Sequence, residues 1–479
     1  MRKQWLPLFS LGILLAALLC SFNIHKTSTS FSILSDTSLP VFKAKDHKAK
    51  TVVSSRGVIT FTTGLENDFY QADSNRRTAY LYLDVKLASL LNAPVKRNPL
   101  NISIVIDRSG SMQGIKMGYA KKAAKAIIDQ LLPTDYVSVV IYDNTIDNVQ
   151  EPVLVSNKEQ IKSRIDGITP RGSTNLWGGT ERGYDFVKKN YNSSFVNRVL
   201  LISDGIANTG LTDSSQIRKN VQRYKDVHGI TISTFGVGLD YNEELMTDMA
   251  ETGSGNYYFI DAPGSLVDLF NKELNSLLRI VAQNAVIKIK IPEGVQIEKT
   301  YSLKYTQVDD VVMIRLLDLF SAETKSNLFK LKLDDKLTKP LKVISTLSYT
   351  DVLDGQEKSL TNENLVAPVK NNDTYLTHFN KPVLEQAILF NANENLERAM
   401  TEADKGNYVD ANKYLALNAA YLQGNAIYVS NSTELKKMDS ANRKYQLFLS
   451  NLKNLSSDSV KKLQKFSRQD SYKLRNKKN

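Results

Sequence analysis

The chain has 479 residues and a formal net charge of +12 at neutral pH. Its length excludes a single hydrophobic core and predicts two to four domains. Cys20 is the only cysteine, which excludes an internal disulfide framework.

Residues 1–22 have the pattern of an export signal. Met1, Arg2 and Lys3 form a short positive region, and residues 6–22 are an almost unbroken apolar run that is short for a membrane span. Cys20 lies where a bacterial lipoprotein carries its acylated cysteine, but Leu19 replaces the small residue that the lipobox motif has at that place. Both lipidation of Cys20 and a plain apolar role inside the signal therefore stay open. Residues 23–50, rich in Ser, Thr and Lys, are expected to form a linker.

Residues 51–99 predict the first part of a β-sandwich. Within 78–89, apolar residues alternate strictly with polar or amphipathic ones, and the apolar set is Leu81, Leu83, Val85 and Leu87. Such alternation gives one buried and one solvated face, which is typical of an antiparallel sheet.

A different pattern begins at residue 100. Residues 102–106 predict a strand that is buried on both faces and that runs directly into Asp107, Ser109 and Ser111. A helix is predicted immediately afterwards, over 113–132. Ligands bind at this edge of open α/β sheets, and three hard oxygens on one loop suit magnesium, calcium or manganese rather than zinc.

Two further oxygen donors are predicted to return to the same edge. Thr174 lies in a turn before a helical run, and Asp204 ends an apolar strand. At these five positions the chain resembles a von Willebrand factor type A (VWA) domain, whose metal-ion-dependent adhesion site combines a D-x-S-x-S loop with a distant Thr and a distant Asp. Residues 234–238 and 250–255 are similar to the closing part of that family, so the resemblance covers residues 100–283.

The resemblance implies a role for each of the five residues. Ser109, Ser111 and Thr174 would ligate Mg²⁺, or alternatively Mn²⁺ or Ca²⁺, directly. Asp107 and Asp204 would hold the ion mainly through coordinated water. An inner shell of neutral hydroxyls leaves the ion most of its charge, so it would bind a partner protein that presents an Asp or Glu carboxylate. Each residue alone could be a helix cap or a turn residue, and only the complete set in this order favours the metal site.

Alternating strands return over 284–368, and we interpret them as the second part of the same sandwich. The predicted fold class is thus a doubly wound, Rossmann-like α/β domain inserted in a β-sandwich and followed by a C-terminal helical region. This flanking arrangement is similar to that of bacterial surface proteins and inter-α-trypsin-inhibitor-like proteins.

The C-terminal part changes to helical spacing. A linker is expected over 369–381 and a helical region over 382–455, in which residues 403–408 resemble the turn of a tetratricopeptide repeat. No second copy of the repeat follows, so we expect a helical hairpin that packs on its neighbours. Residues 456–479 are expected to be a basic tail, because eight basic residues follow position 460 and only Asp470 opposes them. We interpret this charge as solvated or in contact with the envelope, and nucleic acid is not an expected partner of an exported protein.

An enzyme is not expected. The four histidines have no zinc spacing, and no nucleophile, Walker or dinucleotide motif stands in a suitable strand and helix context. The sequence favours a cation-dependent protein-binding or adhesion module, exported to the bacterial cell envelope or periplasm, with the N-terminal segment or the basic tail as membrane contacts. Two alternatives stay open: an accessory subunit of a chelatase or ATPase-like assembly, and a structural envelope protein with a vacant site.

Overall fold

A computed structural model describes residues 41–71, 77–89, 98–204, 206–239, 241–260 and 263–476. The expected signal at 1–22, Cys20 and residues 23–40 of the expected linker lie outside the described residues.

The α/β domain is built on a six-stranded sheet with the order β10-β9-β8-β5-β6-β7. All neighbours in this sheet are parallel except β6 and β7, so β7 is an antiparallel edge strand. The central strand β5 is buried at every residue, as its apolar run predicts. The strands are β5 (Leu100–Asp107), β6 (Tyr136–Tyr142), β7 (Ile146–Leu154), β8 (Val196–Ser203), β9 (Thr231–Val237) and β10 (Tyr257–Ile260).

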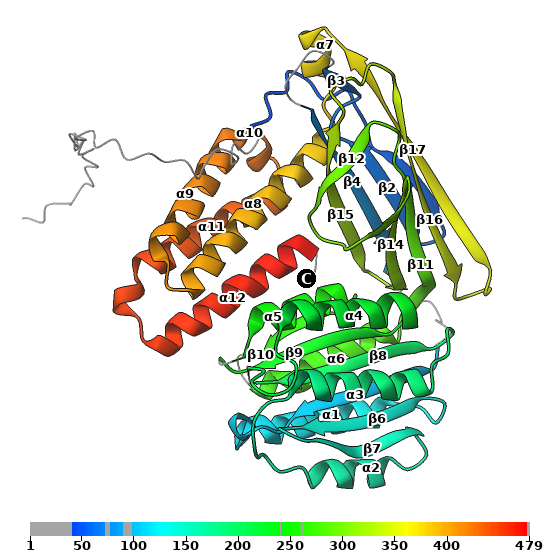
Figure 1. Cartoon of the computed structure of the whole chain (residues 1–479), viewed down its shortest axis with the longest axis vertical. Helices are drawn as coiled ribbons and strands as arrows, with labels where there is room; N and C mark the ends of the chain where they lie inside the picture. The colour runs from blue at the N-terminus through cyan, green and yellow to red at the C-terminus, as the bar shows by residue number, and fades with distance from the viewer. Residues whose placement is uncertain are drawn as a thin grey trace, which may run out of the picture. The chain divides into compact units, whose positions relative to one another are not determined.

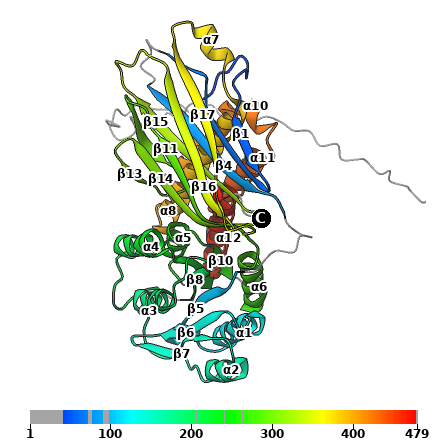
Figure 2. The same ribbon diagram turned by 90° about the vertical axis from the view of Figure 1, so that its right-hand side faces the viewer.

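Helices cover both faces of this sheet, which confirms the doubly wound fold. Ile104 and Ile106 of β5 belong to a core shared with α1, α2 and α6, whereas Val105 belongs to a second core shared with α3, α4 and α5. Figure 2 shows the sheet between the two helix layers. The helices are α1 (Ile115–Gln130), α2 (Lys158–Asp166), α3 (Leu176–Lys189), α4 (Ser214–His228), α5 (Glu243–Thr252) and α6 (Leu266–Leu277).

The sandwich is assembled from strands on both sides of the α/β domain. One sheet has the order β1-β2-β4-β15-β12 and the other β13-β14-β11-β16-β17-β3, so each sheet contains strands from before and after the insert. The strands before it are β1 (Val52–Arg56), β2 (Ile59–Leu65), β3 (Phe69–Gln71) and β4 (Thr78–Leu87). The strands after it are β11 (Ile280–Lys290), β12 (Val295–Thr300), β13 (Thr306–Val308), β14 (Val311–Phe320), β15 (Thr324–Leu333), β16 (Leu341–Asp351) and β17 (Glu357–Val369).

The two ends of the insert lie side by side. β4 pairs with β15 antiparallel along almost its whole length, and Asn98 donates a hydrogen bond of 2.8 Å to Gln283. The expected domain boundary at 283/284 falls inside β11, because Ile280 already pairs with Phe320 of the sandwich. The insertion predicted from the sequence is therefore present. However, β11, the first strand of the second part of the sandwich, begins before the expected boundary.

The C-terminal helices are α7 (Asn372–Thr377), α8 (Lys381–Asp404), α9 (Tyr408–Gly424), α10 (Ala426–Val429), α11 (Thr433–Ser450) and α12 (Ser457–Asn476). Helix α8 lies against α9, α11 and α12 and also contacts β4 and β15 of the sandwich. Two stretches expected as linkers are structured instead. Residues 369–381 contain α7, and residues 41–50 lie against the helical region, where the Phe42 N–H donates to Asn425 Oδ1 at 3.1 Å.

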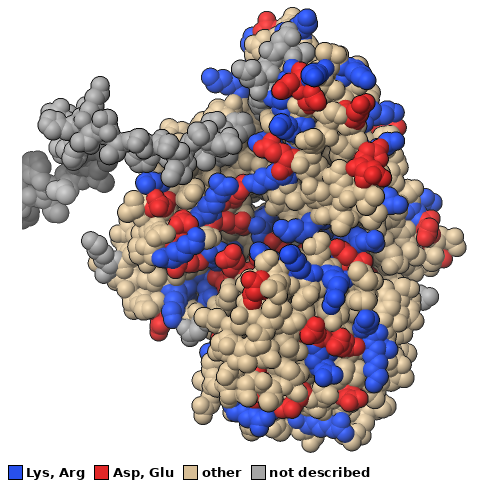
Figure 3. Space-filling model, viewed as in Figure 1, with Lys and Arg blue, Asp and Glu red and all other residues tan. Residues whose placement is uncertain are grey.

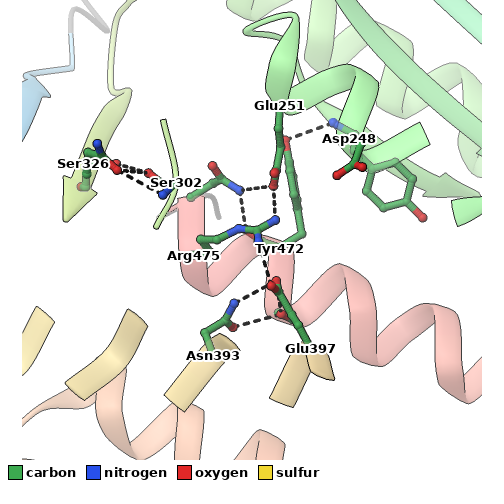
Figure 4. A network of polar contacts seen from close by, with 12 residues as sticks. Asp248, Glu251, Ser302, Ser326, Asn393, Glu397, Tyr472 and Arg475 are labelled. Carbon is green, nitrogen blue, oxygen red and sulfur yellow. Dashed lines mark hydrogen bonds and ion pairs between the residues drawn. The ribbon is translucent and has the colours of Figure 1, made fainter. Parts of the chain in front are cut away.

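The expectation of a solvated or lipid-contacting basic tail is wrong for residues 457–476. They form α12, and Tyr472 on this helix is only 3% exposed and belongs to the core beneath α4 and α5. Its hydroxyl accepts a hydrogen bond of 3.2 Å from the Tyr257 N–H. Arg475 forms ion pairs with Glu251 of α5 and Glu397 of α8 (Figure 4). Lys465, Arg468 and Arg475 of α12 thus face acidic partners of the protein itself, whereas Lys461 and Lys462 at its start are exposed. The helix ties the α/β domain to the helical region.

Charges of both signs are mixed on one face of the molecule. Lys and Arg side chains lie among Asp and Glu over the face shown in Figure 3. In the part of the chain that the structure describes, no helix has both the length and the apolar character needed to cross a membrane.

The shared sandwich predicts the behaviour of a fragment. Residues 284–368 expressed alone should aggregate or stay unfolded, because they lack β1, β2 and β4 and leave the edge of β15 unpaired. Circular dichroism and size-exclusion chromatography check this, and adding a peptide of residues 51–89 should increase the soluble folded fraction. A monomeric, cooperatively folded 284–368 fragment would contradict the assembly from both sides.

The packing of α12 predicts a stability effect. Tyr472→Ala should destabilise the protein by about 3 kcal/mol, because it removes a large buried ring and leaves a cavity beneath α5. The matched control is Asp470→Ala, which alters an exposed residue of the same helix. Thermal and urea unfolding should separate the two variants, and equal stabilities would show that α12 does not support the core.

Candidate metal centre

Asp107 ends β5 and is fully buried. Its Oδ1 accepts a hydrogen bond from the Ser109 N–H at 2.8 Å, and its Oδ2 accepts one from the Ser203 hydroxyl at 2.8 Å. Burial raises the pKa of Asp107 to about 6, although these hydrogen bonds oppose the rise. The first contact is an Asx turn, which folds the loop back so that Ser109 and Ser111 follow Asp107 on the same side.

The hydroxyls of this loop connect β5 to β8. Ser109 Oγ and Ser111 Oγ are 3.0 Å apart, and the Ser111 hydroxyl donates to Asp204 Oδ1 at 2.8 Å. Parallel pairing of β5 with β8 brings these side chains together, because Ile106 lies opposite Ile202 near the ends of both strands. Four of the five predicted residues therefore form one continuous run of hydrogen bonds.

Thr174 lies on the neighbouring loop, just before α3. Backbone hydrogen bonds join the two loops: the Gly110 N–H donates to Gly172 O at 3.1 Å, and the Arg171 N–H donates to Arg108 O at 2.7 Å. Gly172 has φ +71°, a left-handed conformation that favours glycine. Thr174 is 3% exposed, and its N–H donates to Asn208 Oδ1 at 2.9 Å. The loops that carry all five predicted residues thus meet at one edge of the sheet.

A buried carboxylate beneath these loops was not predicted from the sequence. Asp143 follows β6 and accepts hydrogen bonds from Arg171 Nε at 2.8 Å and from the Thr145 hydroxyl at 2.7 Å. Burial would raise the pKa of Asp143, but these donors and the nearby Arg108 lower it to about 2. Asp143 therefore anchors the Thr174 loop as an ionised acid. The sequence contains a pattern that could have predicted the position of Asp143, because this residue follows an apolar strand just as Asp107 and Asp204 do.

The donors present fit a hard divalent cation. They are three hydroxyls and two carboxylates, with no sulfur or imidazole among them. Of the five predicted residues, Ser111 is the exposed one, so the site opens to solvent next to Ser111. Among the described residues, no group of three or more His, Cys, Asp or Glu side chains is placed to hold a metal ion.

Comparison with known sequences assigns the domain. Residues 101–272 match the family described as von Willebrand factor type A domain. The uncharacterized protein YfbK of Escherichia coli is 32% identical over 192 residues, which are 40% of this chain and 33% of that protein. Inter-alpha-trypsin inhibitor heavy chain H2 of Mus musculus is 31% identical over 199 residues, which are 39% of this chain and 21% of that protein. The chain thus spans a third or less of these two relatives.

Two solved structures share the fold. A von Willebrand factor type A protein from Catenulispora acidiphila has a TM-score of 0.64 at 14% identity and covers 81% of this chain and 91% of its own. The ArnB paralog VWA2 from Sulfolobus acidocaldarius has a TM-score of 0.59 at 16% identity and covers 88% of this chain and 99% of its own. Since the matched share is far larger than residues 101–272, the similarity of fold includes parts outside the α/β domain.

Proposed function

Because residues 101–272 are a von Willebrand factor type A domain, we propose that the chain is a non-enzymatic protein-binding module that depends on a divalent cation. The observation that carries the proposal is the run of contacts from Asp107 through Ser109 and Ser111 to Asp204, at the carboxyl edge of the sheet.

The proposed ligands divide into two kinds. Ser109, Ser111 and Thr174 would hold Mg²⁺, or alternatively Mn²⁺ or Ca²⁺, through their hydroxyls. Asp107 and Asp204 are engaged by Ser109, Ser203 and Ser111 and would act on the ion through water. Since the inner ligands are neutral, the bound ion supplies an open coordination position with strong attraction for an anion.

The proposed partner is a protein that presents an Asp or Glu side chain on an exposed loop. Such a carboxylate would bind the ion at the open side of the site, next to the exposed Ser111. We further propose that the interaction takes place in the bacterial cell envelope or periplasm, on the basis of the export pattern of residues 1–22. The basic residues of α12 are not proposed as the binding surface, because Lys465, Arg468 and Arg475 face acidic groups of the protein itself.

The metal proposal predicts a change in thermal stability. Mg²⁺ or Mn²⁺ should raise the melting temperature by mass action, with a gain of about 2.7 kcal/mol when the free ion is at a hundredfold excess over Kd. Ser109→Ala and Thr174→Ala should abolish the rise, whereas the exposed Ser193→Ala should keep it. Calorimetry with and without the ion is the measurement, and a wild-type protein that does not respond to either ion would refute the metal assignment.

The partner proposal predicts that binding requires both the ion and its ligands. Pull-down from bacterial envelope extracts should recover a partner in Mg²⁺ and lose it in EDTA. Thr174→Ala and Asp204→Ala should reduce recovery at least about tenfold, because the contact is made through the ion. Lys461→Ala and Lys462→Ala, at exposed positions near the start of α12, serve as controls. Recovery that persists in EDTA or in Thr174→Ala would place the interaction elsewhere on the chain.

A further inference from the structure

Lys116 is a basic side chain built into the candidate metal centre. It lies in the first turn of α1, and its Nζ is 2.5 Å from Asp204 Oδ2. The Asp204 side chain is fully buried, whereas the Lys116 side chain is 26% exposed to solvent. Its stem lies beside Gly238, where an added Cβ would be 3.1 Å from Lys116 Cε. The Lys116 side chain thus passes close to the backbone after β9 and reaches Asp204.

The two oxygens of Asp204 have different partners. Oδ1 accepts from the Ser111 hydroxyl at 2.8 Å, whereas Oδ2 faces Lys116. A divalent cation ligated by Ser111 would therefore lie on the Oδ1 side. Because the ammonium occupies the other oxygen, cation and lysine can be present in the site together.

The net charge of the site differs between the state without a divalent cation and the state with one. Asp107 and Asp204 are both fully buried, and Lys116 forms an ion pair with Asp204. Without a divalent cation, Lys116 compensates Asp204, which would otherwise be a buried carboxylate without an opposite charge. With a divalent cation, two carboxylates face three positive charges, so the loaded site has a net positive charge.

We propose that Lys116 is a resident counter-cation of the metal centre. It stabilises the site when no divalent cation is bound, it weakens cation binding by repulsion, and it makes the loaded site selective for an anionic partner group. This inference rests on the proposed metal binding. A purely structural ion pair would instead stabilise the protein equally with and without the cation, and the experiment below separates the two roles.

The experiment compares the full chain with Lys116→Met, Lys116→Arg and Lys122→Met. Lys116→Met removes the charge and retains an apolar stem, Lys116→Arg keeps the charge, and Lys122→Met removes one exposed charge from the same helix. In EDTA, Lys116→Met should lower the melting temperature by about 5 °C or more, because it leaves Asp204 uncompensated. Lys116→Arg should recover part of this loss, and Lys122→Met should change little.

Adding Mn²⁺ is the decisive step. The rise in melting temperature should be larger for Lys116→Met than for the wild type, and the Mn²⁺ Kd should fall at least about threefold, because the ion no longer meets a neighbouring ammonium. An equal or weaker Mn²⁺ affinity of Lys116→Met would overturn the counter-cation role. A wild type that does not bind Mn²⁺ would overturn the proposed function itself, which is a distinguishable result.

The selectivity for anions has its own readout. At saturating Mn²⁺, acetate serves as a probe for the carboxylate of a partner. Acetate should bind the wild type and Lys116→Arg more tightly than Lys116→Met, as measured by the change in water-proton relaxation of the bound Mn²⁺. Equal acetate affinities in all three proteins would contradict a net positive charge supplied by Lys116.

Discussion

The pairing of β4 with β15 is the constraint on which the arrangement of the chain depends. These strands lie on either side of an insert of almost two hundred residues, and they run side by side from Thr78 opposite Lys332 to Lys86 opposite Thr324. Leu81 and Phe329 are opposite each other in this ladder, and both are fully buried. The pairing fixes both ends of the α/β domain at one place, where Asn98 meets Gln283. Since β5 begins near this junction at Leu100, its carboxyl end at Asp107 lies at the opposite edge of the sheet from the junction.

Helix α12 provides a second connection. Its ion pairs are partly buried, and such pairs contribute little net stability once the loss of hydration is counted. Burial raises the pKa of Glu243 to about 7 even though Lys465 lies close by. The positive charge of Lys465 therefore offsets only part of what the Glu243 carboxylate loses when it is removed from water. The favourable part of the contact is the apolar burial of Tyr472 among residues of α4, α5 and β10. The charged groups of α12 therefore determine its orientation more than its affinity for the α/β domain.

The sequence predicts those features whose physical cause is local. The alternation at residues 81–87, the fully apolar run at 102–106 and the hydroxyls after Asp107 each lie within one short segment, and the structure has the antiparallel sheet, the buried strand and the loop there. The solvated face expected for the first of these strands is wrong at Tyr82, which is buried on the strand that α8 contacts. Features that depend on distant partners were missed. Tyr472 is buried by residues more than two hundred positions earlier, and the many basic residues around it suggested solvent exposure instead. Likewise, Lys116 meets Asp204 across 88 positions, and no local pattern reveals that contact.

The central claim is that hydroxyls from two loops hold a divalent cation at the edge of the sheet. A crystal of the chain grown with Mn²⁺ and measured at an X-ray energy where manganese scatters anomalously tests it most directly. The account predicts an anomalous peak at ~2 Å from the hydroxyl oxygens of Ser109, Ser111 and Thr174. Asp107 and Asp204 should lie one water further away, and Lys116 should still contact Asp204. A peak bound directly by both carboxylates, or no peak among these five residues at saturating Mn²⁺, would contradict the account.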